Sequence, residues 1–245
     1  MNNEKDISKR QARREQIRRK DQRNRLIGIG LISIGAIFIA FLIIYPNFKP
    51  AAEVIAAEPR SYPQADKTAL GDPNAPVKID VYEDFQCPAC GRYTEETESL
   101  IIDNLVSTGK VYYVFHNYPF IDGPGAGSKG ESDQAANASM CAAEQNKFWE
   151  MHATIFANWN GENQRAYSDE RLKAFAEKTG LDMTAFNSCF KANKYKAEIQ
   201  ADFDNGNVVG VQGTPSVFVN GSFVTPGYVP SYDEVVTAVE AALAE

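Results

Sequence analysis

The chain has 245 residues, of which 44 % are hydrophobic, enough for the packed core of one or two domains. Its net charge of −7 is unevenly distributed: residues 1–25 carry ten Lys or Arg against four Asp or Glu, so residues 26–245 carry −13. A body this acidic repels phosphate backbones, which excludes nucleic acid as an expected partner.

The first predicted element is a transmembrane helix directly after Arg25. Residues 26–45, LIGIGLISIGAIFIAFLIIY, contain no charge, and a helix of this length spans about 30 Å, the thickness of the hydrocarbon core of a bilayer. A cleaved signal peptide is the alternative, but its apolar region usually has only about 7–15 residues. We therefore expect one retained membrane anchor.

The charges of residues 1–25 orient this anchor. Their excess of Lys and Arg predicts a cytoplasmic N-terminus by the positive-inside rule, and no nucleic acid is needed to explain it. The rest of the chain then lies outside the cytoplasm, as part of a single-pass protein of the cell membrane. In that compartment disulfide bonds form and persist.

Residues 46–70 predict a linker between the anchor and a folded domain. They are rich in Pro and Ala, and four prolines forbid a continuous helix. Such a segment holds a domain away from the membrane in a semi-extended conformation. The folded domain is expected to comprise residues 71–245.

The domain opens with a strand, a helix and a second strand. Apolar and polar residues alternate over residues 77–82, which is the period of a strand. The next segment, CPACGRYTEETESLIIDNLV, predicts a helix with Pro88 at its first position, and KVYYVFHNYPF predicts the second strand. This order predicts a βαβ unit.

A long helical region follows, over about residues 119–210. Its helical patterns are ASMCAAEQNKFWEMHATIFANW, RAYSDERLKAFAEKTG and MTAFNSCFKANKYKAEIQADF. A β pattern then returns, with Asn220 and Gly221 favouring a tight hairpin turn, and a helix with the capping box Ser231 and Glu234 ends the chain. The whole order predicts an α/β fold with one sheet and a helical insertion.

Two of the four cysteines, Cys87 and Cys90, lie at the start of the first helix of the domain. A helix N-terminus presents unpaired N–H groups and the positive end of the dipole, so the pKa of the Cys87 thiol should fall. Cys90, one turn inward, is placed to attack a mixed disulfide on Cys87. Structural zinc needs four ligands, and Cys141 and Cys189 do not form a second C-x-x-C pair, so we expect no metal and no cofactor.

Over about residues 70–245 the chain resembles the DsbA-type thiol-disulfide oxidoreductases of the thioredoxin-like superfamily. The resemblance rests on the helical insertion and on the segments LGDPNAPVKIDVYEDFQCPAC, AEQNKFWEMHATIF and GVQGTPSVFVNG. It implies a thioredoxin-like fold with an inserted helical subdomain. It also implies that Cys87 is the nucleophile and Cys90 the resolving thiol. A cis Pro215 and the backbone of Thr214 would bind an extended substrate segment.

The sequence departs from this family at two points. The dipeptide between the cysteines, Pro88-Ala89, contains no histidine to stabilise a thiolate, and Val81 stands where the family often has an acid. Glu83 shares the Val81 face of the strand and is the candidate proton carrier. A solvated carboxylate at the strand end is the alternative reading of Glu83, and Asp84 is a weaker candidate still.

Two histidines could approach the dithiol. His116 ends the second strand, and His152 lies three residues after Trp149 in a helical pattern. Packing among aromatic side chains explains His152 well enough. Neither histidine is therefore assigned a role.

The remaining cysteines, Cys141 and Cys189, are expected to form a structural disulfide. Both fall in helical patterns of the insertion, and a compartment outside the cytoplasm favours the bridge. Two buried free thiols that act as small hydrophobic side chains are the alternative.

The predicted function is a membrane-tethered, extracytoplasmic thiol-disulfide oxidoreductase that introduces or exchanges disulfides in exported proteins. Its partners would be reduced or misoxidised exported proteins and a membrane or soluble redox partner that recycles the dithiol. A reductase or isomerase on the same fold is one alternative. A carrier that binds Cu(I) through the two thiolates is the other, because thiolates select that ion.

Overall fold

The computed structural model describes residues 2–44, 53–123 and 130–244, which belong to two compact units, residues 1–51 and 52–245. In the first unit, α1 (Asn2–Ile44) is one continuous helix that contains the basic residues and the apolar residues up to position 44. Its stretch Arg18–Phe41 is long and apolar enough to cross a membrane, by length and composition alone. Leu31, Ile32 and Phe38 in this stretch are exposed.

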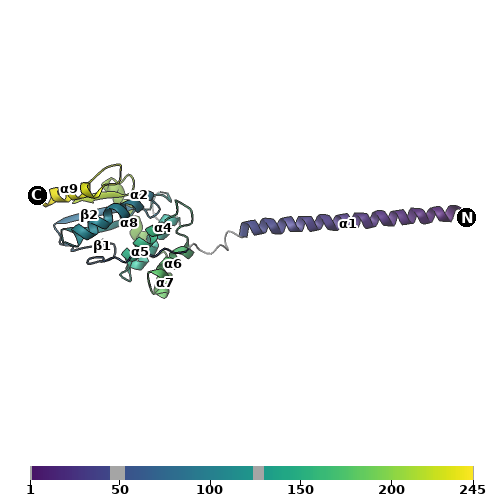
Figure 1. Ribbon diagram of the computed structural model, residues 1–245, viewed down its shortest axis with the longest axis horizontal. Coiled ribbons are helices and arrows are strands. Elements are labelled where there is room, and N and C mark those ends of the chain that lie inside the picture. Colours follow the sequence, from purple (N-terminus) through teal and green to yellow (C-terminus); the bar gives the residue numbers. More distant parts are fainter. Residues whose placement is uncertain (1, 45–52, 124–129, 245) are drawn as a thin grey trace. The chain divides into compact units, whose positions relative to one another are not determined.

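The second unit is built on one five-stranded sheet with the order β1-β3-β2-β4-β5 (Figure 1). Its strands are β1 (Ala69–Leu70), β2 (Val77–Glu83), β3 (Val111–Asn117), β4 (Ser216–Val219) and β5 (Ser222–Phe223). The central strands β2 and β3 run parallel, as the predicted βαβ unit requires, and the other neighbours pair antiparallel. β1 was not predicted, because two residues are too few to show an alternating pattern.

One helical segment connects β2 to β3. It begins as α2 (Pro88–Tyr93) and continues through η2 (Thr94–Glu98), α3 (Ser99–Ile101) and η3 (Ile102–Val106). The sequence predicted a continuous helix here, and the structure interrupts it with two stretches of wider, π-helical hydrogen bonding. Such stretches are frequent at functional sites.

The described residues of the helical insertion form five helices, which are α4 (Glu131–Ala143), α5 (Phe148–Ala157), α6 (Asp169–Lys178), α7 (Met183–Lys191) and α8 (Lys196–Val209). Two of the predicted helical patterns each resolve into two helices. The breaks occur at Asn146 and Asn193, which have φ values of 56° and 47°. Asn tolerates this left-handed conformation better than most residues, so each one ends a helix inside an otherwise helical pattern.

The chain ends as the sequence predicts. Asn220 and Gly221 form the turn between β4 and β5, both with positive φ. Ser231 caps α9 (Tyr232–Leu243) and forms a complete capping box with Glu234. α9 packs against β4 and β2, whereas α4–α7 pack mainly on one another.

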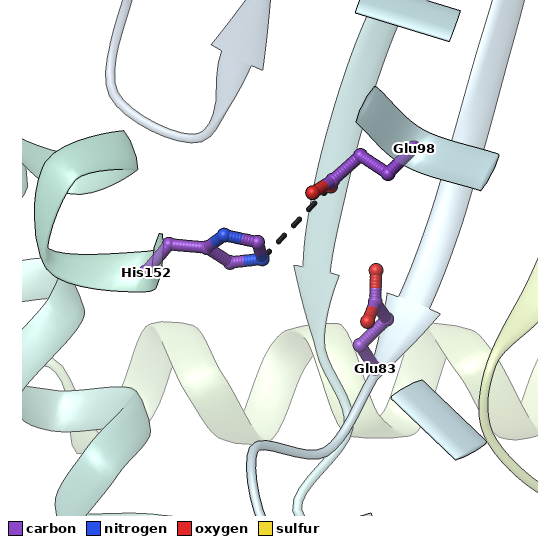
Figure 2. Close-up of side chains that lie close together, drawn as sticks. All are labelled: Glu83, Glu98 and His152. Atoms are coloured by element: carbon purple, nitrogen blue, oxygen red, sulfur yellow. Dashed lines mark ion pairs between the residues drawn. The ribbon is translucent and has the colours of Figure 1, made fainter. Parts of the chain in front are cut away.

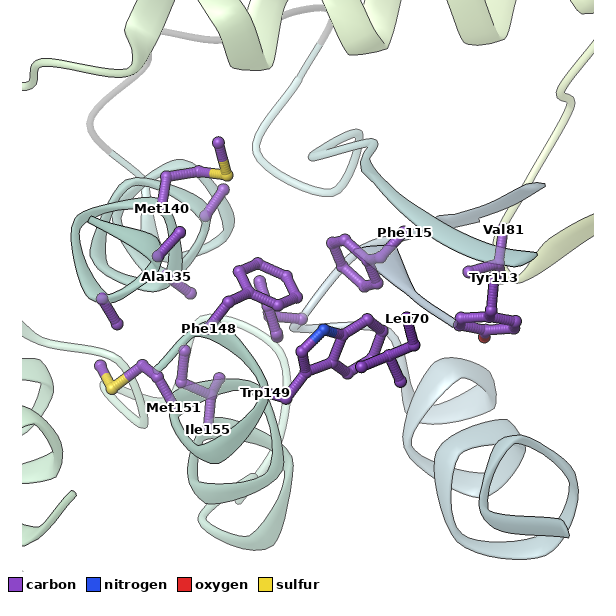
Figure 3. Close-up of a cluster of buried hydrophobic side chains, with 14 of the residues drawn as sticks. Leu70, Val81, Tyr113, Phe115, Ala135, Met140, Phe148, Trp149, Met151 and Ile155 are labelled. Atoms are coloured by element: carbon purple, nitrogen blue, oxygen red, sulfur yellow. The ribbon is translucent and has the colours of Figure 1, made fainter. Parts of the chain in front are cut away.

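The insertion and the sheet share one hydrophobic core (Figure 3). Leu70 of β1 and Phe115 of β3 meet Phe148 and Trp149 of α5 there, and all four side chains are fully buried. The indole N–H of Trp149 donates to the backbone oxygen of Ala69 at 3.4 Å. The domain is therefore one α/β fold in which a helical insertion packs on the sheet, as the sequence predicts.

Part of the segment expected to be a linker lies on the domain. The backbone of Ile55 exchanges two hydrogen bonds with the side-chain amide of Asn158, at 3.0 and 2.8 Å. Arg60 forms an ion pair of 2.6 Å with Asp103 and also donates to the backbone oxygen of Ser99. From residue 53 on, these contacts hold the predicted linker against the folded unit.

Candidate active site

The site is centred on two free thiols at the start of α2. Cys87 occupies the N-cap position, with Pro88 as the first helical residue. Cys87 is 7 % exposed and Cys90 is 0 % exposed. Cys87 therefore keeps a small exposed area, whereas Cys90, one turn along the helix, is fully buried.

The surroundings of the two thiols separate their acidities. The pKa of Cys87 is lowered to about 6, first by the Cys90 thiol and then by the Thr214 side chain and the N–H groups of Cys90 and Ala89, which together outweigh burial. The pKa of Cys90 is raised well above its ordinary value by burial and then by its interaction with Cys87. The shift at Cys87 has the predicted direction. At neutral pH Cys87 is largely a thiolate and Cys90 keeps its proton.

The loop before β4 lies directly beside Cys87. Cys87 Sγ lies 3.3 Å from the backbone oxygen of Thr214, and the Thr214–Pro215 peptide bond is cis. A cavity of about 610 Å³ borders Ala89, Thr214 and Pro215 and extends to Tyr228. This arrangement places the predicted substrate-binding residues next to the reactive sulfur.

Glu83 lies at the end of β2 and is only 1 % exposed. The reading of Glu83 as a solvated carboxylate is therefore wrong, because Val77, Ile79, Val81 and Glu83 all point into the core on the buried side of β2. Burial raises its pKa well above the ordinary value, the charges of Glu98 and Cys87 raise it further, and the nearby Cys90 lowers it in part. Neither carboxylate oxygen has a hydrogen-bond partner at normal distance among the residues that the structure describes.

Asp84 holds the loop that carries the dithiol. Its carboxylate accepts hydrogen bonds from Gln86 N at 2.8 Å, Ser132 Oγ at 2.6 Å and Ile121 N at 3.0 Å. Burial raises its pKa to about 7, although these hydrogen bonds lower it. Both carboxylate oxygens of Asp84 are thus used to hold this loop against α4 and against the segment that follows β3.

The two histidines lie in different surroundings. His116 Nε2 is 2.7 Å from Asp80 Oδ1 and its Nδ1 is 3.3 Å from Asp202 Oδ1. Burial lowers the pKa of His116, but the two carboxylates overcome it, and the net pKa lies above its ordinary value. Asp80 and Asp202 thus pair with both ring nitrogens of His116.

His152 is buried among aromatic rings, as predicted, with ring centroids 4.9 Å from Phe156 and 5.2 Å from Phe115 and Trp149. The sequence did not reveal its approach to Glu98, whose Oε1 lies 3.9 Å from His152 Nε2. Glu98 itself was not singled out. Its burial could have been predicted from its helical spacing, because Glu98 falls on the same face of the predicted helix as Ile101, Ile102 and Leu105.

Cys141 and Cys189 are joined in the structure. Their sulfur atoms are 2.01 Å apart, and the bond links α4 to α7 inside the insertion. Both residues are buried, at 1 % and 5 % exposure. The second pair of cysteines is therefore separate from the thiols at α2.

Comparison with known proteins identifies the family. Residues 64–241 match a family model described as thioredoxin. The chain is 24 % identical to a probable disulfide bond formation protein D of Bacillus anthracis over 84 % of this chain and 92 % of that protein. Among solved structures, it resembles BdbD from Bacillus subtilis, with 21 % identity and a TM-score of 0.65 over 79 % of this chain and all of that one.

DsbA from Chlamydia trachomatis has the same fold, with 21 % identity and a TM-score of 0.60 over 80 % of this chain and 98 % of that one. The match to the family model covers most of the folded unit, including both thiols of α2 and the Thr214–Pro215 loop. The chain therefore belongs to the thioredoxin family and is a DsbA-like thiol-disulfide oxidoreductase.

Proposed function

We propose that this oxidoreductase is a protein disulfide oxidase, tethered to the membrane, that introduces or exchanges disulfides in exported proteins through Cys87 and Cys90. The observation that carries the proposal is the opposed chemistry of the two thiols. The pKa of Cys87 is lowered to about 6 and that of Cys90 is raised, so the low-pKa sulfur is the better leaving group. A dithiol whose reduced form is stabilised in this way is an oxidant.

The reaction begins with the oxidised enzyme. A substrate thiolate attacks Cys87 Sγ and forms a mixed disulfide, while the bond between Cys87 and Cys90 breaks and Cys90 takes the electron pair. Glu83 is the proposed proton carrier that protonates Cys90, because it is buried beside that thiol and its own pKa is raised. A second substrate thiolate then attacks the substrate sulfur of the mixed disulfide, and Cys87 leaves as a thiolate.

The substrate segment is proposed to bind along Thr214 and Pro215. The cavity there borders both the loop and Ala89 of the redox motif. An extended peptide that pairs with the backbone of Thr214 places its cysteine against Cys87, because the Cys87 thiol lies 3.3 Å from that backbone oxygen. Two electrons pass to the enzyme in each cycle, so a membrane or soluble redox partner must reoxidise the dithiol.

The proposed organisation follows the charges of the chain. Residues 1–25 are a cytoplasmic tail, residues 26–45 the anchor, residues 46–70 a linker whose later part rests on the domain, and residues 71–245 the redox domain. The candidate span Arg18–Phe41 supports an anchor or a signal sequence equally by its composition. The length of the apolar stretch favours the anchor.

A redox titration of the Cys87/Cys90 pair against glutathione tests the oxidase. We expect a potential on the oxidising side of the value of about −270 mV that is typical of thioredoxin, and Ala89→His should raise it further by adding a positive charge beside the thiolate. A potential at or below that value, with the protein found reduced in cells, would favour a reductase. Stoichiometric copper in the purified protein would favour the carrier.

A further inference from the structure

Three buried side chains converge on one point inside the domain. Figure 2 shows the imidazole of His152 on α5 and the carboxyl groups of Glu98 on η2 and Glu83 on β2 pointing toward one another. One ligand atom from each residue lies within 4.8 Å of the other two. The three residues are between 1 % and 3 % exposed.

Few of these ligand atoms have a hydrogen-bond partner, and the Cys90 thiol beside Glu83 offsets the burial of that carboxyl group only in part. His152 Nε2 and both oxygens of Glu83 form no hydrogen bond within residues 53–123 and 130–244. Leaving a buried polar atom without a partner costs about 1–3 kcal/mol, and more for a charged group. Glu98 differs, because Tyr113 donates to its Oε1 at 3.1 Å and holds that carboxyl group in place.

The imidazole is ready to bind a cation, whereas the two carboxyl groups must first lose their protons. Burial lowers the pKa of His152 to about 3, so its imidazole is neutral at physiological pH and has a lone pair to share. Burial also raises the pKa of Glu83 and Glu98, which shows that two negative charges are unfavourable there without a compensating charge. A divalent cation supplies that charge and makes the cluster neutral.

We infer that Glu83, Glu98 and His152 form a site for one divalent cation, of which Zn²⁺ fits best. Zn²⁺ binds imidazole nitrogen and carboxylate oxygen at about 2.0–2.2 Å and accepts three protein ligands with a fourth position open. Ca²⁺ and Mg²⁺ prefer six or more oxygen ligands, which this cluster does not offer. The present separation of 3.9 Å between Glu98 Oε1 and His152 Nε2 closes to a zinc geometry by small side-chain movements.

An acidic cavity leads to the site. Glu98 and His152 line a cavity of about 700 Å³, together with Tyr62 and Gly91. Three acidic residues and one basic residue also line it, namely Glu58, Glu95, Asp103 and Arg60. The basic one is already paired with Asp103, so the free charges favour the arrival of a cation.

The site connects to the redox reaction through Glu83. This consequence rests on the proposed function, in which Glu83 carries the proton of Cys90. Zn²⁺ and the proton compete for the same carboxylate, so the metal-loaded enzyme should form mixed disulfides several-fold more slowly than the metal-free enzyme. Zinc would thus act as an inhibitor and not as a catalyst.

The binding test uses the full chain in detergent, stripped with a chelator and held in the disulfide form, so that Cys87 and Cys90 cannot bind the metal. Titration against a chromogenic chelator should give one Zn²⁺ per chain. Glu98→Gln and His152→Gln should each weaken the affinity for Zn²⁺ at least tenfold. His116→Gln is the matched control, because His116 also lies between two carboxylates but has both nitrogens paired, and it should bind as the wild type does.

Replacement by Co²⁺ should give the visible absorption of a four-coordinate ion, which a merely structural role of His152 does not predict. The inference is overturned if the oxidised wild type binds no Zn²⁺, or if binding survives His152→Gln. Disulfide exchange by the metal-free enzyme tests the proposed function separately. A chain that binds zinc but does not oxidise thiols would refute only the function, and an active oxidase without zinc binding would refute only the site.

Discussion

At the residue scale, the reactivity of the site depends on where each sulfur lies on one helical turn. Cys87 at the N-cap has a small exposed area and donors around it, whereas Cys90 is closed off by the sheet and the buried carboxyl group of Glu83. The same motif residues therefore receive opposite pKa shifts. Position on the helix, and not residue type, separates the thiol with the lowered pKa from the thiol with the raised pKa.

The first prediction concerns the pH dependence of Cys87. In the reduced protein, its alkylation rate should have a midpoint near pH 6 and fall about tenfold per pH unit below it, because only the thiolate reacts. Cys90→Ala should raise the midpoint, since the Cys90 thiol is the largest cause of the low pKa. The midpoint is measured from the rate of iodoacetamide labelling across about pH 4–9, a range that covers both the lowered pKa of Cys87 and the ordinary pKa of a cysteine thiol. A midpoint near the ordinary value in the wild type would contradict the prediction.

The second prediction assigns the two steps of exchange. Cys90→Ala should accumulate mixed disulfides with exported proteins, because Cys87 still reacts and no thiol of the enzyme remains to attack the mixed disulfide on it. Cys87→Ala should accumulate none, since Cys90 is fully buried. Non-reducing electrophoresis of both variants gives the answer, and the reverse pattern would exchange the two roles.

Short sequence motifs pointed to the two thiols and to the loop beside them. They did not point to the contact between Glu98 and His152, which depends on how the chain folds. Cys87, Cys90 and the Thr214–Pro215 loop followed from short motifs and a family resemblance. The approach of Glu98 to His152 joins a helix after β2 with the insertion, 54 positions later in the chain, and no local pattern records it. The burial of Glu83 did follow from strand parity once β2 was known to run straight to its last residue.

At the scale of elements, periodicity predicted the strands β2 and β3, the hairpin and α9 with its cap. It failed where single residues end an element, at Asn146 and Asn193, because a left-handed φ is a local conformation that apolar periodicity does not report. It also missed β1, whose two residues pair with Val114 and Tyr113 of β3. Whether such short segments form a strand depends on tertiary contacts and not on a local sequence pattern.

The third prediction concerns the bond between α4 and α7. Replacing Cys141 and Cys189 with Ala should lower the free energy of unfolding by up to about 4 kcal/mol, because the bond closes a loop of 48 positions and restricts the unfolded chain. Urea unfolding of the variant and of the wild type, without reductant, measures the difference. Peptide mapping is the control: two alkylatable thiols at these positions in unreduced protein would refute the bridge.

At the scale of the whole molecule, the two units differ in chemistry. Residues 1–25 are strongly basic and the part after them is acidic, while α1 exposes large apolar side chains such as Ile32. The unit 52–245 has its own core, which includes β1 and contacts from residues 53–70. Because this unit has its own hydrophobic core, we expect it to fold without α1, which leaves α1 available for a separate role such as membrane anchoring.

The last prediction tests whether that role is membrane anchoring. If residues 26–45 span the membrane with the N-terminus inside, protease added to intact spheroplasts should digest the part beyond about residue 46. The basic tail should stay protected, although its ten Lys and Arg residues are the best trypsin sites in the chain. Epitope tags at the two ends report the two halves, and a detergent-lysed sample shows that trypsin can cut the tail. A mature protein that begins near Ala57 or Glu58 would instead identify the apolar segment as a cleaved signal peptide, because the tail and the span would then be absent from the product.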